Sequence, residues 1–212
     1  WDQWLKGIDR GVMDDPDYTA YLMDGVRPQT WYDTRPGRWI SLRDWPQGPT
    51  VSDWQLRGDG TMQPADNATA SADGDMNMIV ASPQDCGMDG GEYCAIWLGP
   101  EMPGDQRSDN ARSACFTSAT LTENTDIVGA PSVRLRLCAD APAAQIAVRL
   151  NHIHPDGAAT RITYGVLNLA HRNGHHAADS LIPEKATEIT LDLDHIAYPV
   201  SYTHLTLPTK FV

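Results

Sequence analysis

Two histidines at H-x-H spacing are the first candidates for chemistry in this sequence. In a strand, His152 and His154 would place both imidazoles on one face. Some all-β metal sites use that spacing, together with a Glu and a third His, to bind iron, manganese or zinc. No Glu follows His154 within four residues, and Asp156 falls in an expected turn. We therefore predict surface or hydrogen-bonded histidines, no metal and no cofactor. A metal-dependent enzyme stays as an alternative hypothesis.

A nucleophile for covalent catalysis is absent from the sequence pattern. Hydrolases of the α/β type hold a serine on a G-x-S-x-G turn, and no serine or cysteine here has glycine two residues before and two after it. In the stretch Pro103–Arg107, Arg107 could clamp a substrate carboxylate. We favour instead a tie from Arg107 to Asp105 or to the backbone, which would pin the loop. The sequence therefore offers no catalytic residue.

The four cysteines, Cys86, Cys94, Cys115 and Cys138, allow three disulfide connectivities. None is spaced as C-x-x-C, which argues against zinc-ribbon and thioredoxin-like sites. Cys86 and Cys94 could close a small loop around Gly87–Gly91, while buried free thiols fit a bacterial cytosolic protein at least as well. We favour the bacterial cytoplasm over secretion and leave the disulfide state open.

Composition and charge narrow the classes of partner. Of the 212 residues 41% are hydrophobic, enough for a core, and 16 basic against 28 acidic residues give a formal net charge of −12. A negative surface repels phosphate backbones and anionic lipids, so we expect no nucleic-acid partner and no membrane partner. No apolar run reaches the length of a transmembrane helix. Because the chain opens on Trp1 rather than Met, we expect the natural start to lie upstream.

The elements that position these residues begin with a short helix and continue as strands. Trp1, Trp4 and Leu5 fall on one helical face, and Gly7 can end the helix. This short piece has nothing of its own to pack against. The pattern then predicts strands at Tyr18–Met23, Arg38–Leu42 and Trp54–Arg57. It predicts a tight turn at Gly58–Gly60 and a polar loop at 63–75.

The second half of the chain alternates apolar and polar residues. The apolar residues are odd-numbered in 133–139 and 189–193 and even-numbered in 146–150, and Ile162, Tyr164 and Val166 follow the same rule. One wet and one dry face on each strand is typical of antiparallel sheets in a sandwich. No strand–helix–strand rhythm occurs, which argues against a doubly wound α/β fold. The sequence therefore predicts an all-β, antiparallel β-sandwich.

Local stretches of the chain resemble one family of hydrolases. Trp1–Gly7 is similar to the W-D-x-W-L-K-G helix end that closes the α/β-hydrolase domain of CocE/NonD serine hydrolases, which include cocaine-esterase-like and X-prolyl dipeptidyl-peptidase-like enzymes. Six later segments of this sequence are similar to segments that occur in the same order in the family: Arg38–Trp39, Asp44–Pro46, Pro103–Arg107, Cys115–Ser118, Asp126–Leu137 and His154–Gly157. The resemblance covers nearly all residues before 199. It implies a jelly-roll, galactose-binding-like sandwich packed against a catalytic domain.

The resemblance also implies the function. Residues 1–16 would be the end of the hydrolase domain and its linker, and 17–199 the accessory sandwich, inactive by itself. The parent would cleave acyl esters or amides such as X-Pro dipeptides through an acyl-enzyme, with its Ser, Asp and His upstream of residue 1. Ile96 and Trp97 are the candidates for lining the substrate pocket, and for Trp97 packing in the core or the domain interface is the alternative.

Several partners and one alternative function remain open. The expected partners are the missing hydrolase domain and a small acyl ester or peptide substrate, and a homodimer stays open. The alternative function is a free-standing jelly-roll module that binds carbohydrate or protein, with Trp31, Trp39 and Trp45 as an aromatic platform. The leading helix end argues against this alternative, because it is intelligible only as part of a neighbouring domain.

The tail departs from the family. The family's closing G-H-R-L/I-R-V strand is expected just after residue 199, but 200–212 resemble instead the translation of a transposon-type sequencing adapter read in frame. We predict that 200–212 are such an artefact, and a genuine terminal strand at 201–207 is the alternative. Without the closing strand, a sandwich would have an open edge and a gap in its core. We therefore expect a marginally stable or aggregation-prone chain.

Overall fold

The computed structural model describes residues 1–46, 51–67, 78–91, 102–200 and 203–211. The helices of this part are α1 (Asp2–Lys6), α2 (Arg107–Asn110) and short 3-10 turns at Val12–Asp14, Ala65–Asn67, Met88–Gly90 and Leu169–His171. The strands are β1 (Tyr18–Met23), β2 (Gly37–Leu42), β3 (Trp54–Leu56), β4 (Thr61–Pro64), β5 (Ala114–Ser118), β6 (Thr125–Gly129), β7 (Ser132–Leu137), β8 (Gln145–Ile153), β9 (Ala159–Asn168), β10 (Thr187–Asp192), β11 (Ile196–Val200) and β12 (His204–Phe211). The predicted all-β class is confirmed.

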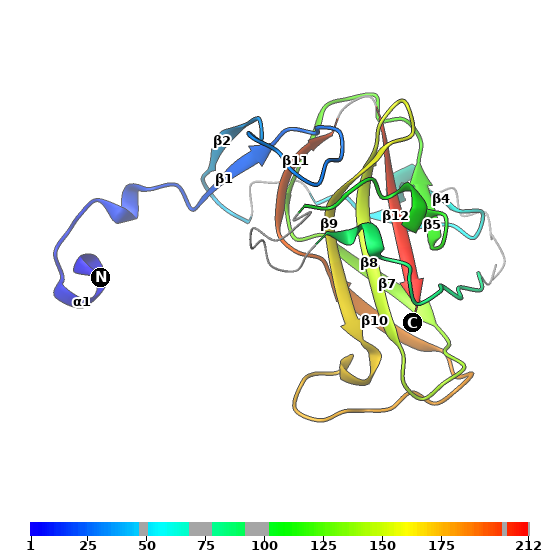
Figure 1. Cartoon of the computed structure of the whole chain (residues 1–212). Coiled ribbons are helices and arrows are strands. Elements are labelled where there is room, and N and C mark those ends of the chain that lie inside the picture. The colour runs from blue at the N-terminus through cyan, green and yellow to red at the C-terminus, as the bar shows by residue number, and fades with distance from the viewer. Residues whose placement is uncertain (47–50, 68–77, 92–101, 201–202, 212) are drawn as a thin grey trace.

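Two layers of strands enclose the core (Figure 1). One layer is a six-stranded sheet in the order β3-β4-β5-β12-β8-β9, in which only the β4–β5 pair is parallel. The two-stranded pairs β7–β10 and β6–β11 pack against the same core from the other side, and the β1–β2 pair contacts β11. The core joins Ile146, Val148 and Leu150 of β8 to Ile189 and Leu191 of β10, as the alternation predicted.

The first half of the chain folds close to its predicted elements. Gly7 adopts φ +67° and ends α1, and β1 has the predicted bounds Tyr18–Met23. The turn between β3 and β4 is tight, because the Gly60 N–H donates to the Arg57 carbonyl at 3.0 Å. Strand β4 takes Gln63 and Pro64 from the stretch expected to be a loop.

Strand β9 departs from the predicted alternation because it contains a bulge. Leu150 of β8 pairs with Thr163, but the next residue, Asn151, pairs with Arg161, so Ile162 is the extra residue. A bulge turns the following side chains to the opposite face. The prediction that Tyr164 and Val166 share the dry face of Ile162 is therefore wrong, and Val166 is 56% exposed.

Strand β12 lies in the middle of the six-stranded sheet, between β5 and β8. Thr206 pairs with Thr117 of β5 on one side and with Asn151 of β8 on the other. Leu205 and Leu207 are buried in the core. The open edge and the core gap that were expected between β5 and β8 are therefore not found, because residues 204–211 form the strand that fills this place. The adapter origin of 200–212 is not tested by this and stays a prediction.

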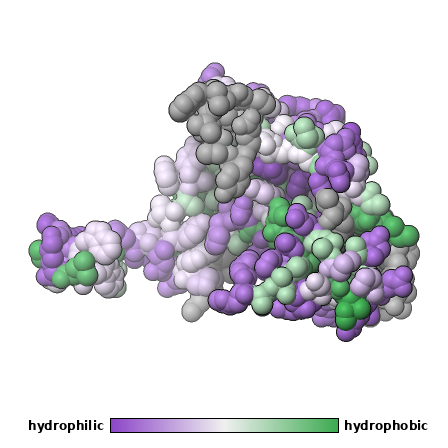
Figure 2. All heavy atoms as spheres, turned by 60° about the horizontal axis from the view of Figure 1, so that its bottom comes forward, coloured by the Kyte–Doolittle hydropathy of each residue, from purple (hydrophilic) through white to green (hydrophobic). Residues whose placement is uncertain are grey.

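The N-terminal segment stands apart from the sandwich, with hydrophobic side chains on its surface (Figures 1 and 2). Trp1, Trp4 and Leu5 are 88%, 69% and 73% exposed. Large apolar groups on the surface mark faces that pack against a partner. Among the residues described, no helix is long and apolar enough to cross a membrane.

Candidate functional site

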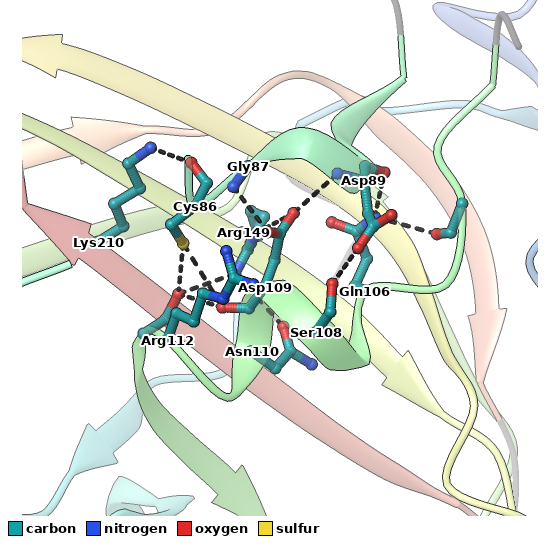
Figure 3. Close-up of polar contacts among 12 residues, drawn as sticks. Cys86, Gly87, Asp89, Gln106, Ser108, Asp109, Asn110, Arg112, Arg149 and Lys210 are labelled. Carbon is teal, nitrogen blue, oxygen red and sulfur yellow. Dashed lines mark hydrogen bonds and ion pairs between the residues drawn. The ribbon is translucent and has the colours of Figure 1, made fainter. Parts of the chain in front are cut away.

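A buried polar network holds two loops against the outer face of the six-stranded sheet (Figure 3). One loop runs through residues 86–91, and the other contains α2 and the residues just before it. Figure 3 shows side chains from both loops converging near Arg149 of β8. The contacts of these loops with each other and with Arg149, among the described residues, are hydrogen bonds and an ion pair, and we attribute the position of the loops to them.

Asp109, in α2, is the centre of this network. Its carboxylate accepts hydrogen bonds from the Gly87 N–H at 2.7 Å and the Asp89 N–H at 3.1 Å. The same carboxylate lies 3.4 Å from the Arg149 guanidinium. Asp109 is 1% exposed, and a carboxylate is tolerated at that depth only when it is hydrogen-bonded and paired.

Gln106 joins the two loops beside Asp109. Its side-chain amide donates to the carbonyls of Asp89 at 2.6 Å and Gly104 at 3.0 Å. The Gly104 N–H also donates to the Asp89 carbonyl, at 3.1 Å. Gln106 is fully buried, and its backbone N–H donates to Ala159 of β9. Both loops are therefore fixed to each other and to the sheet.

The network lies at the two ends of the segment 92–101. Gly91, at φ +75°, lies so close to Met102 that a Cβ on Gly91 would be 2.8 Å from the Met102 carbonyl carbon. The Met102 N–H donates to Thr30, which ties this point to the chain before β2. The chain thus leaves at Gly91 and returns at Met102 through one narrow neck. The pocket candidates Ile96 and Trp97 belong to the segment that begins and ends here, and they lie outside the described residues.

Arg107 is held by Asp105, as the favoured interpretation expected. Its Nε donates to Asp105 at 2.9 Å, and a second nitrogen lies 2.7 Å from the same oxygen. Burial raises the pKa of Asp105, but hydrogen bonds from Arg107 and from the Ala159 N–H outweigh it and leave the pKa below its ordinary value. The structure therefore supports the tie between Arg107 and Asp105 that the favoured interpretation expected.

His152 and His154 lie on one face, as predicted, with ring centroids 4.3 Å apart. The two nitrogens of His152 form hydrogen bonds with the hydroxyls of Tyr198 at 3.0 Å and Thr203 at 2.8 Å. His154 bonds to Thr160 at 2.8 Å. Burial, with a smaller effect from His154, lowers the pKa of His152 to about 4. These are buried, hydrogen-bonded histidines, and no cluster of three or more His, Cys, Asp or Glu fit for a metal occurs in the described part of the chain.

Two of the cysteines and one of the tryptophans named from the sequence lie in structural positions, whereas Trp31 and Trp39 are 61% and 71% exposed. Cys86 and Cys115 are free thiols beside α2, bonded to the carbonyls of Asp109 and Asn110, so Cys86 forms no disulfide. Burial raises the pKa of Cys115. Trp45 stacks on Tyr18 at 4.4 Å and is half-buried, which removes it from the proposed aromatic platform.

Sequence reasoning missed Asp109 and Arg149, and it named Gln106 only as part of the stretch Pro103–Arg107, without a role of its own. The partners of Asp109 are backbone groups about twenty residues upstream, and no spacing rule indicates such a contact. Arg149 gave one signal, because it is a charged residue between two apolar residues, Val148 and Leu150, of β8.

Comparison with known proteins identifies the sandwich. Residues 10–202 match the family model described as the X-Pro dipeptidyl-peptidase C-terminal non-catalytic domain. No curated protein matches the chain at a significant level. The resemblance to CocE/NonD hydrolases is confirmed by this match and by the solved structures that share the fold.

Three solved structures illustrate that shared fold. An aminopeptidase from the marine sediment archaeon Thaumarchaeota archaeon gives a TM-score of 0.61 at 17% identity, over 99% of this chain and 34% of the other. An α-amino acid ester hydrolase gives a TM-score of 0.63 at 16% identity, over 82% of this chain and 32% of the other. A CocE/NonD family hydrolase from Staphylococcus aureus gives 0.61 at 12% identity, over 99% and 36%. The chain spans about a third of the length of each.

Proposed function

Because this chain belongs to the X-Pro dipeptidyl-peptidase C-terminal non-catalytic domain family, we propose that it serves as the accessory domain of a larger CocE/NonD serine hydrolase and borders the catalytic cleft. The chain itself has no serine or cysteine in a nucleophile turn. We place the Ser nucleophile, the His base and the Asp that orients it in the parent's hydrolase domain.

The way in which the two ends of the segment 92–101 are held together, at Gly91 and Met102, is the observation that best supports the cleft-bordering role. Loop residues that line a binding site act precisely only when the elements beneath them are rigid. Here Asp109 and Gln106, both buried, fasten the two ends of the segment to the sheet. So much buried polar structure at the base of ten residues supports a positioning role for that segment. We therefore keep Ile96 and Trp97 as the residues that line the acyl side of the pocket.

The exposed N-terminal segment supports the proposal that a hydrolase domain packs against this chain. Trp1, Trp4 and Leu5 present apolar surface that nothing in the described part of the chain covers. A hydrolase domain joined to this segment would cover it and remove it from water. The accessory domain would then wall one side of the cleft and help to exclude water from the reacting ester or amide.

The reaction proposed for the parent is acyl transfer to water through an acyl-enzyme. The solved structures of similar fold are named as an aminopeptidase and an α-amino acid ester hydrolase. Both names describe cleavage at an acyl carbon, of an amide in one case and an ester in the other. We propose that the parent hydrolyses small acyl esters or amides, X-Pro dipeptides among them.

The test compares the full-length parent with this 212-residue chain. Each is assayed against p-nitrophenyl acetate and an X-Pro p-nitroanilide. We expect the parent to hydrolyse at least one substrate and the chain alone to hydrolyse neither above the buffer rate. Hydrolysis by the chain alone at a rate close to the parent's would contradict the non-catalytic role.

The cleft-bordering role is tested in the parent with Trp97→Ala. We expect the KM of the preferred substrate to rise at least five-fold while the melting temperature changes little. Trp39→Ala is the matched control, because Trp39 is 71% exposed on β2. If Trp97→Ala leaves both kcat and KM at the control's values, Trp97 does not line the pocket.

A further inference from the structure

A cavity of about 240 Å³ lies between the loop 86–91 and the outer face of the six-stranded sheet. The loop contributes Gly87, Gly90 and Gly91 to its wall. The sheet contributes Arg149, Arg161 and Tyr164 of β8 and β9, with Ala147 and Lys210 beside them. Three of these eight residues are cationic, and none is acidic.

The bulge in β9 creates this arrangement. In a regular strand, Arg161 and Tyr164 would point to opposite faces, because they are three residues apart. The extra residue Ile162 turns Tyr164 onto the face of Arg161, and the guanidinium carbon lies 4.5 Å from the centre of the ring. Bulges re-aim side chains in this way next to functional sites. Arg149 projects from the neighbouring strand toward the same space.

The charges of the cavity wall are not balanced by the described residues. Arg149 is paired with Asp109 and is a donor to Asn110 and Ser113. Arg161 forms no ion pair within the described part of the chain. Burial lowers the pKa of Arg161, and Arg149 lowers it further, although Tyr164 and Asp194 act in the opposite direction. Arg161 is half-buried with its guanidinium over the Tyr164 ring, and a bound anion would supply the counter-charge that no ion pair with the described residues provides.

The glycines keep the cationic groups open to the cavity. A Cβ at Gly90 would lie 3.5 Å from Arg161 Nη1, and a Cβ at Gly87 would lie 3.6 Å from Lys210 Nζ. Any longer side chain at these positions would extend into the space in front of the two cations.

We propose that this cavity binds a small oxyanion, a carboxylate or a phosphate, through the guanidinium of Arg161. A guanidinium offers a planar fork of N–H donors that matches two oxygens of such a group. The cavity has room for the anion and several waters, since one water occupies about 30 Å³. Arg149 and Arg161 both precede residue 200, so the two guanidinium groups belong to the sandwich whatever the origin of the tail.

The test is calorimetric titration of the 212-residue chain with sodium acetate and with sodium phosphate, at ionic strength held constant with sodium chloride. We expect saturable binding of at least one anion, with Arg161→Gln weakening it at least ten-fold. Arg134→Gln removes the same charge from an exposed position on β7 and should leave the affinity unchanged. The tighter of the two anions tells a phosphate ligand from a carboxylate ligand.

A second variant protects the test against misfolding of Arg161→Gln, which circular dichroism would reveal. Gly90→Glu keeps every basic residue and places a carboxylate beside Arg161, so it should abolish binding, whereas Gly90→Gln adds similar bulk without charge and should weaken it less. Absence of saturable binding to both anions would overturn the proposal. Equal affinity in the wild-type chain and Gly90→Glu would overturn it as well.

Discussion

Asp109 and Arg149 form an ion pair at 3.4 Å in which the side chains are only 2% and 9% exposed. Asp109 belongs to α2 and Arg149 to β8, so the pair links the neck of the segment 92–101 to the sheet. The removal of two charges from water is unfavourable, and their attraction offsets it only when further hydrogen bonds complete the set. Here Gly87, Asp89 and Ser113 provide such bonds.

Asp109→Asn should therefore destabilise the chain strongly. It leaves Arg149 buried without its counter-charge, and breaking a buried pair in this way costs about 3–5 kcal/mol. Urea unfolding followed by circular dichroism gives the free energy of unfolding. Asp85→Asn is the control, because Asp85 pairs with Arg112 at 2.9 Å on the surface, where a pair contributes about 0–1 kcal/mol. Equal losses in the two variants would contradict the role given to Asp109.

The stability of the chain should fall as the pH decreases from 6.5 toward 4. Burial lowers the pKa of His152 from 6.5 to about 4 in the folded chain, so over this range the unfolded chain binds a proton that the folded chain excludes. Protonation then favours unfolding, and the full loss is about 3 kcal/mol. The aspartates with lowered pKa values, Asp59, Asp105 and Asp156, act at lower pH, near and below 3.8.

Urea midpoints at pH 7.5, 6.5, 5.5 and 4.5 measure this dependence. His152→Gln should reduce the slope above pH 4.5, and the slope that remains comes from His154, whose pKa burial also lowers. His175→Gln, which changes an exposed histidine, should keep the wild-type slope. A midpoint that stays constant from pH 7.5 to 4.5 in the wild-type chain would show that His152 has an ordinary pKa.

The strands β7, β8 and β10 were predictable because their residues alternate between apolar and polar. In β8, Ile146, Val148 and Leu150 point into the core and the residues between them do not, so the sequence carries the pattern directly. The bulge at Ile162 was not predictable, because no glycine or proline marks it and Tyr164 and Val166 continue the apolar rhythm. Only the pairing with β8 shows where the register shifts.

The candidate site was less predictable than the fold. The stretch Pro103–Arg107 was correctly picked out, and so was the tie between Asp105 and Arg107. The central residue Asp109 was missed, since its partners are N–H groups of a distant loop whose position depends on the whole sheet. A local sequence motif can indicate a loop of interest, but it does not reveal the residues that hold the loop in position, because these make their contacts with distant parts of the chain.

Removal of residues 201–212 should make the chain insoluble or abolish cooperative melting. The truncation deletes β12 and leaves unpaired backbone on β5 and β8, which are then available for association with other chains. It also removes Leu205 and Leu207 from the core. Size-exclusion chromatography and thermal melting of the two lengths measure the effect. Identical, cooperative behaviour of both would show that the tail does not complete the fold, as expected of an adapter-derived segment.

Gly91→Ala should open the neck and destabilise the chain more than a glycine replacement at an unconstrained turn. At φ +75° and ψ −169° Gly91 lies in a backbone region that is essentially restricted to glycine, where a side chain costs about 1–3 kcal/mol. The added Cβ would also lie 2.8 Å from the backbone of Met102. Gly157→Ala is the matched control, with φ +84° and no atom within 4 Å of the added Cβ. The difference between their urea-unfolding free energies measures the constraint at Gly91, which combines its glycine-specific backbone conformation with the contact with Met102. A loss no larger than that of the control would mean that the two ends of the segment move apart freely, and the neck would then not position Ile96 and Trp97.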